Sequence, residues 1–144
     1  MRGRVVAVCS VVIIAALVAG VGLVTGLVLR HVVQTAPLWL AAGVSLWRPR
    51  VAAWLALPCF LFWLALMIVI WLYLLDVAHL VNGHFSPVEI VMTIVVGLAS
   101  AAGARGAARL LRPFSAMGAG LFVAGAALQL ACFRLSFLPG IAHR

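Results

Sequence analysis

Four long runs of apolar residues dominate the chain, at about residues 5–29, 51–75, 87–103 and 113–137. The segments between them are short and contain most of the arginine and histidine. A bilayer core about 30 Å thick is crossed by a helix of about 20 mostly apolar residues, so each run is typical of a membrane-spanning helix. The pattern therefore predicts an all-α, integral membrane four-helix bundle in which residues 1–144 form a single polytopic membrane domain.

A shorter apolar segment lies between the first two runs. Thr35 is a suitable N-cap, Pro37 fits a first helical turn, and Arg48-Pro49 provides a stop. We expect a short interfacial helix over about residues 36–47, because Trp39 and Trp47 suit the headgroup level of a bilayer.

Composition supports the membrane interpretation. The sequence is 67% hydrophobic and 8% charged, and its two acidic residues are Asp76 and Glu89. A soluble domain has about a quarter of its residues charged. The net charge of +8 comes from arginines that flank the apolar runs, which indicates anchoring to the lipid bilayer and no nucleic acid partner. Binding of anionic lipid is the alternative use of one arginine group, Arg105, Arg109 and Arg112.

The arginines also bear on orientation. With four spans, Arg30, Arg48, Arg50, Arg105, Arg109 and Arg112 lie on one side and Arg2, Arg4, Arg134 and Arg144 on the other. The positive-inside rule then favours both termini outside, although the first span opposes this assignment. The first run is too long for a signal peptide, so we expect a retained helix. An alanine-rich chain without lysine is typical of a GC-rich bacterial genome, which predicts a multi-pass protein of the bacterial inner membrane.

Candidate chemistry is concentrated between the second and third runs. If the second helix continues to Asn82-Gly83, then Tyr73, Asp76 and His79 share a face. A carboxylate beside an imidazole can relay protons or bind a divalent metal, and His84 is near enough in sequence to contribute. The alternative is structural: an interfacial Asp76–His79 pair and a solvated His84. Ser86 and Glu89 have the spacing of a capping box, which accounts for Glu89 as a helix cap.

Other polar and small residues predict helix contacts. Arg134, near the end of the fourth run with Gln129, is predicted to pair with Asp76 and so to join the second helix to the fourth. The row Ala116, Gly120 and Ala124 predicts close packing within the bundle, and Gly22 and Gly26 form a GxxxG pattern. The cysteines make no C-x-x-C motif, and His31 is predicted on the opposite face from His79 and His84, so no cofactor is expected.

These patterns predict a non-enzymatic accessory or scaffolding subunit that acts through helix–helix contacts with a membrane-protein partner or in a homo-oligomer. No catalytic, cofactor-binding or metal-binding set is expected. The alternative is a small transporter, or a protein that handles protons or metal, that uses the polar cluster of Asp76, His79, His84 and Arg134.

Overall fold

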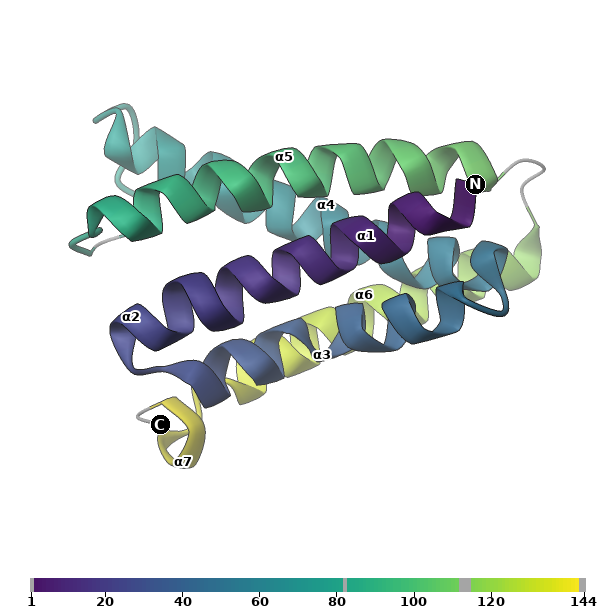
Figure 1. Cartoon of the computed structure of the whole chain (residues 1–144), viewed down its shortest axis with the longest axis horizontal. Helices are drawn as coiled ribbons and strands as arrows, with labels where there is room; N and C mark the ends of the chain where they lie inside the picture. Colours follow the sequence, from purple (N-terminus) through teal and green to yellow (C-terminus); the bar gives the residue numbers. More distant parts are fainter. Residues whose placement is uncertain (1, 82, 112–114, 143–144) are drawn as a thin grey trace.

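The computed structural model describes residues 2–81, 83–111 and 115–142, and this part of the chain contains helices and loops but no strands (Figure 1). The elements are α1 (Arg2–Ala15), which continues as a π-helix, η1 (Ala16–Gly22), and α2 (Leu23–Thr25), then α3 (Val28–Ser45), α4 (Pro49–Leu74), α5 (Pro87–Leu110), α6 (Ala116–Leu135) and α7 (Pro139–Ala142).

Four helical segments are long and apolar enough to cross a membrane. They are Arg4–Thr25, Pro49–Leu74, Pro87–Leu110 and Ala116–Leu135. The all-helical fold and the four long apolar helices are therefore as predicted. The first segment ends earlier than expected, because Gly26 has a φ of 72°, in the left-handed region that glycine adopts at little cost.

The segment between the first two spans differs most from the sequence prediction. Helix α3 runs from Val28 to Ser45, so it is 18 residues long and begins well before residue 36. Thr35 lies inside it and donates its hydroxyl hydrogen to the carbonyl oxygen of His31 at 2.8 Å. Pro37 also lies inside the helix. The prediction that Thr35 caps a short helix with Pro37 in its first turn is therefore wrong.

Helix α3 is a full member of the bundle. Figure 1 shows it running beside α1 and α6, and it packs against α1, α4 and α6. Its length corresponds to about 27 Å at 1.5 Å per residue, close to the thickness of a bilayer core. Its inner face buries Gln34, Thr35, Leu38 and Ala41. Polar residues on this inner face lower its mean hydropathy, which is why the sequence does not resemble a spanning helix.

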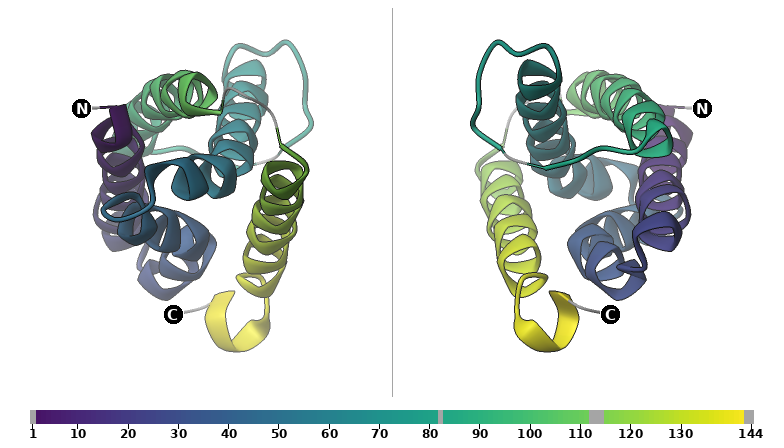
Figure 2. Two further views of the ribbon diagram at one scale, coloured as in Figure 1. Left: turned by 90° about the vertical axis from the view of Figure 1, so that its right-hand side faces the viewer. Right: turned by 90° about the vertical axis from the view of Figure 1, so that its left-hand side faces the viewer.

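The five long helical segments form a ring. Viewed along the bundle, α1, α5, α4, α6 and α3 follow one another around it, and each packs against the next (Figure 2). Near its start α4 is deeply buried, with Ala52, Ala53 and Ala56 at 0% exposure, whereas Leu66 and Ile70 near its other end are partly exposed. The start of α4, at the end of the bundle that holds Pro49, therefore fills the space between the other helices. At the opposite end of the bundle this space is less filled by side chains.

Glycines set the close approaches between the helices. A Cβ atom at Gly103 of α5 would lie 2.7 Å from the Phe60 ring of α4, and one at Gly125 of α6 would lie 2.6 Å from the Leu55 carbonyl oxygen. Gly118 faces the Trp54 ring in the same way. The predicted row of Ala116, Gly120 and Ala124 is instead exposed on the outer face of α6. The row prediction is wrong because the helix presents a different face to α4.

Candidate functional site

Asp76 lies at the end of α4, which stops at Leu74 and does not continue to Gly83. It has a φ of 58°, and it is the one non-glycine residue with positive φ in the described part of the chain. The amide of Asp76 donates to the Tyr73 carbonyl at 3.0 Å, and the amide of Val77 donates to the Leu72 carbonyl at 2.9 Å. These two bonds are a Schellman motif, so Asp76 is the left-handed residue that ends the helix. Asn82, also expected at this helix end, lies outside the described residues.

Asp76 and His79 do contact each other, as an exposed pair. Nε2 of His79 lies 2.9 Å from Oδ1 of Asp76, while the two side chains are 62% and 86% exposed, respectively. The Tyr73 ring packs edge-on against His79, and its hydroxyl donates to the Gly83 carbonyl at 2.9 Å. His84 is exposed in the same loop. This arrangement orders a loop at the surface, and an exposed ion pair contributes about 0–1 kcal/mol.

A glycine at position 76 tests this structural assignment. We expect Asp76→Gly to be more stable than Asp76→Ala, with a free energy of unfolding about 1 kcal/mol higher. The reason is that only glycine adopts positive φ without steric cost. Thermal unfolding of the two purified variants, followed by circular dichroism in one detergent, measures the difference. Equal stability of the two variants would contradict a helix-ending role for Asp76.

Arg134 does not form the predicted pair with Asp76. Among the described residues, the one ion pair is that of Asp76 with His79, and Arg134 is exposed in the last turn of α6. Near a helix C-terminus, its charge is favourable toward the helix dipole. The predicted charge pair between α4 and α6 is therefore not formed, and the two helices are joined by the glycine contacts described above.

A buried polar network joins α6 to α3. Nε2 of Gln34 donates to Oγ of Ser136 at 3.0 Å, and Nε2 of Gln129 donates to the Gln34 carbonyl at 3.1 Å. Both glutamines are buried. Hydrogen bonds inside an apolar bundle fix the position of one helix against another, because the polar groups have no water as an alternative partner.

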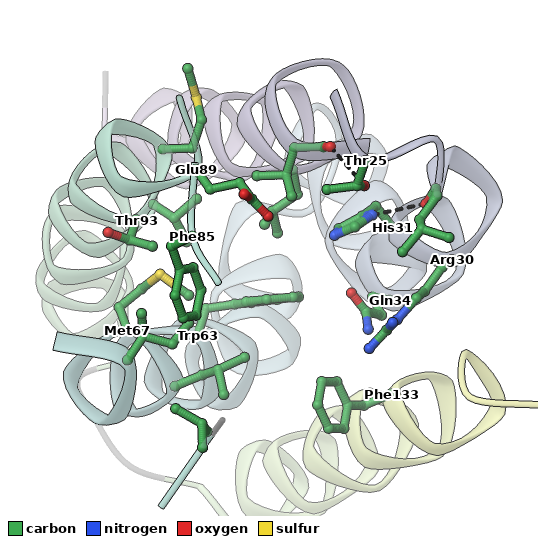
Figure 3. Close-up of a pocket in the computed structure, with 18 of the residues that line it drawn as sticks. Thr25, Arg30, His31, Gln34, Trp63, Met67, Phe85, Glu89, Thr93 and Phe133 are labelled. Atoms are coloured by element: carbon green, nitrogen blue, oxygen red, sulfur yellow. Dashed lines mark hydrogen bonds between the residues drawn. The ribbon is translucent and has the colours of Figure 1, made fainter. Parts of the chain in front are cut away.

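Ser86 and Glu89 begin α5 with the capping box that their spacing predicts. The amide of Ser86 donates to Oε2 of Glu89 at 2.7 Å, and the amide of Glu89 donates to Oγ of Ser86 at 3.3 Å. Glu89 lies on the inner side of this first turn, and its carboxyl group borders a cavity (Figure 3). The side chain therefore has both a capping position and access to the interior.

The cavity has a volume of about 300 Å³ and lies at the less filled end of the ring. All five long helical segments or their flanking turns contribute to its walls, which are mainly apolar. The apolar walls include Leu17, Val21, Trp63, Leu66, Met67, Ile70, Met92, Val96, Phe133 and Phe137. Two of these, Leu17 and Val21, belong to η1, and π-helical turns are frequent beside functional sites.

Arg30 brings a full positive charge to this cavity. Its guanidinium lies over the Phe137 ring, with Cζ 4.3 Å from the ring centroid, and its buried Nε has no hydrogen-bond partner. No carboxylate among the described residues forms an ion pair with it. A guanidinium in an apolar wall with unused N–H donors is arranged to accept an anion.

His31 contributes a hydrogen-bond acceptor, Nε2, to the cavity wall. Its Nδ1 lies 2.9 Å from the Leu27 carbonyl oxygen, so in the neutral ring the proton is on Nδ1 and Nε2 is the acceptor. Figure 3 shows the second ring nitrogen directed away from Leu27 toward the cavity, where Glu89 also points. His31 is at the same end of the bundle as the loop with His79 and His84, so its predicted position on the opposite face is wrong. In the described part of the chain, no group of three His, Cys, Asp or Glu side chains could hold a metal ion.

The sequence pattern missed this site for identifiable reasons. Arg30 and His31 resemble the flank of a membrane span, and Gln34 resembles a loop residue, as long as α3 is not treated as part of the bundle. The available signal was their spacing: 30, 31 and 34 share one face of a helix. The capping box accounts for Glu89 in the sequence, so its second position at the cavity has no sequence signal.

Comparisons with known proteins give no assignment. No protein-family model, no curated protein and no solved structure matches the chain. The function must therefore be inferred from the geometry of the cavity.

Proposed function

We propose that the chain is a non-enzymatic protein of the bacterial inner membrane that binds an amphipathic molecule within its helix bundle. The observation that carries the proposal is the cavity of about 300 Å³, with apolar walls and with Arg30, His31 and Glu89 among its lining residues. Ligand sites of this size are usually apolar with a few polar groups that orient the ligand. An intramembrane charge without a protein partner is also a marker of function.

The membrane topology in this proposal has five crossings, with α3 as the second. The starts of α1 and α4 and the end of α5 lie at one end of the bundle (Figure 1). Arg4, Arg48, Arg50 and Arg109 belong to these helix ends by their positions in the chain. By the positive-inside rule this end is cytoplasmic, which places the N-terminus inside and the C-terminus outside. The cavity opens at the opposite, extracytoplasmic end.

Transport or proton handling through Asp76 and His79 receives less support. Both side chains are mostly exposed in a surface loop, and Asp76 is explained by the end of α4. A relay or a transport site requires polar groups that continue into the bundle, and the polar groups that do so come from α3 and α5.

An accessory or scaffolding role is the second candidate. Ala116, Gly120 and Ala124 form a smooth exposed row on α6, and a Cβ atom at Gly120 would meet nothing within 4 Å. Small residues allow another membrane helix to approach closely. Isolation from native membranes in mild detergent tests this role: a stoichiometric partner that Gly120→Leu removes would support it, and a lone wild-type protein would contradict it.

A bulky residue in the cavity tests ligand binding. We expect Ile70→Trp to lose the amphiphile that copurifies with the wild type, because the added ring occupies part of the cavity that Ile70 lines. Ile68→Trp is the matched control, since Ile68 is exposed on the same helix. Native mass spectrometry of the detergent-solubilised proteins measures the bound mass. Identical bound masses in the two variants, or no bound molecule in the wild type, would overturn the proposal.

A further inference from the structure

Two opposite charges border the cavity without contacting each other. Arg30 comes from the first turn of α3 and Glu89 from the first turn of α5, and both line the same space. Their side chains form no ion pair, since the described part of the chain has only the pair of Asp76 and His79. Figure 3 shows the ring of His31 near both side chains. Either charge alone would favour a simple ion, but the two together favour a ligand that carries both signs.

The unused hydrogen-bonding groups match the charge at each position: acceptors at Glu89 and His31, and donors at Arg30. Glu89 uses Oε2 for the Ser86 amide, which leaves Oε1 as an acceptor, and Nε2 of neutral His31 is a second acceptor. On the other wall, the buried Nε of Arg30 has no acceptor among the described residues, and its guanidinium lies over the Phe137 ring. A carboxylate beside an imidazole acceptor suits a primary ammonium group, and a guanidinium suits a phosphate.

The position and walls of the cavity favour a lipid as the source of this group. The cavity is at one end of the bundle, where phospholipid headgroups lie in a membrane. Deeper in the bundle its walls are apolar, with Leu17, Met67 and Val96 among them. Such walls accept the glycerol and the first part of an acyl chain, because the apolar surface of both partners is removed from water.

We infer that the cavity binds a phosphoethanolamine group, with its ammonium at Glu89 and His31 and its phosphate at Arg30, as part of phosphatidylethanolamine. This inference rests on the proposed function, and it names the chemical class of the ligand. A zwitterion gives each of the two protein charges a partner of opposite sign, whereas phosphatidylglycerol gives none to Glu89. Phosphatidylcholine has a quaternary ammonium group that cannot donate a hydrogen bond to the carboxylate.

Native mass spectrometry with three dioleoyl phospholipids tests the inference. The purified, delipidated full chain is incubated with dioleoyl phosphatidylethanolamine, phosphatidylcholine or phosphatidylglycerol at equal concentration. We expect the wild type to retain phosphatidylethanolamine about tenfold more than either of the others, which is the usual scale of one charge-assisted hydrogen bond. Equal retention, or a preference for phosphatidylglycerol, would overturn the inference.

Glu89→Gln is the decisive variant because it removes the charge and keeps the helix cap. Glutamine also serves in a capping box, so α5 still begins at Pro87. We expect this variant to lose its preference for phosphatidylethanolamine over phosphatidylcholine, and Arg30→Gln to lose retention of all three lipids. Asp76→Asn, which changes the other carboxylate, is expected to behave as the wild type. An unchanged lipid preference in Glu89→Gln would overturn the assignment of the ammonium group to Glu89.

Soluble phosphoethanolamine distinguishes the two sources of the group. If it displaces the lipid at millimolar concentration, the ligand is recognised through its headgroup and a free zwitterion is a sufficient ligand. If it does not, while phosphatidylethanolamine is still preferred, the lipid itself is the ligand. A bound amphiphile that is not zwitterionic, lost in Ile70→Trp, would refute this inference and leave the proposed function intact. The absence of any bound amphiphile would refute both.

Discussion

Replacing Gly125 by leucine is expected to abolish the folded protein. A Cβ atom at this position would lie 2.6 Å from the carbonyl oxygen of Leu55 and 3.0 Å from Cγ of Pro58. The first of these atoms belongs to the backbone of α4, so a change of side-chain rotamer cannot make room. Overpacking in a core usually costs about 1–3 kcal/mol, and a backbone clash costs more, against a total stability of about 5–15 kcal/mol.

Gly120→Leu is the matched control for this prediction. It makes the same change on the same helix, at a position where a Cβ atom meets nothing within 4 Å. Size-exclusion chromatography in mild detergent measures the yield of monodisperse protein for each variant. We expect a loss of most monodisperse material for Gly125→Leu and a yield near that of wild type for Gly120→Leu. Equal yields for the two variants would contradict the close packing of α4 against α6.

The four long apolar helices were predictable because their signal is local. In each, the apolar run itself determines the helix, and the start of α5 is determined by Ser86, Pro87 and Glu89 within one turn. The positions of glycines in the packing were less predictable. Ala116, Gly120 and Ala124 have the right spacing for a contact face, but the rotation of α6 directs Gly118 and Gly125 toward α4 instead. Spacing identifies residues that share a face and does not identify the face that is buried.

Helix α3 was not predictable from hydropathy because its polar residues face other helices. Gln34 bonds to Ser136, and its carbonyl accepts from Gln129, so the polar atoms of one helix are matched by another far away in sequence. The candidate site was not predictable for the same reason: its polar residues on α3 face other helices. Arg30, His31 and Glu89 come together only because α3 runs through the bundle beside α1, so a sequence interpretation that leaves α3 at the surface separates them. The exposed Asp76–His79 pair is predictable from the sequence because its two residues are three positions apart.

The location of the N-terminal end of α1 distinguishes a crossing α3 from an interfacial one. With α3 as a crossing, single cysteines at Arg4 and Trp47 lie on the same side of the membrane, and a cysteine at His84 lies on the other. With four spans, the cysteine at Arg4 lies on the side of His84. Of these three cysteines, the one at Arg4 distinguishes the two topologies. Trp47 and His84 lie on opposite sides in both, because α4 separates them in either case. Arg4 and His84 are exposed, and Trp47 is 82% exposed, so all three positions can react.

Labelling of intact cells with a membrane-impermeant maleimide makes the measurement, in a background where Cys9, Cys59 and Cys132 are alanine. We expect His84→Cys to react in intact cells, and Arg4→Cys and Trp47→Cys to react only after the cells are permeabilised. Reaction of Arg4→Cys in intact cells would return α3 to the interface and restore the orientation with both termini outside. The expected result has a physical basis in the arginines: when α3 crosses, Arg4 joins Arg48, Arg50 and Arg109 on one side, and the first span no longer opposes the others. It also fixes the side from which the cavity is reached, because Arg30 and Glu89 lie at the end of the bundle that holds His84.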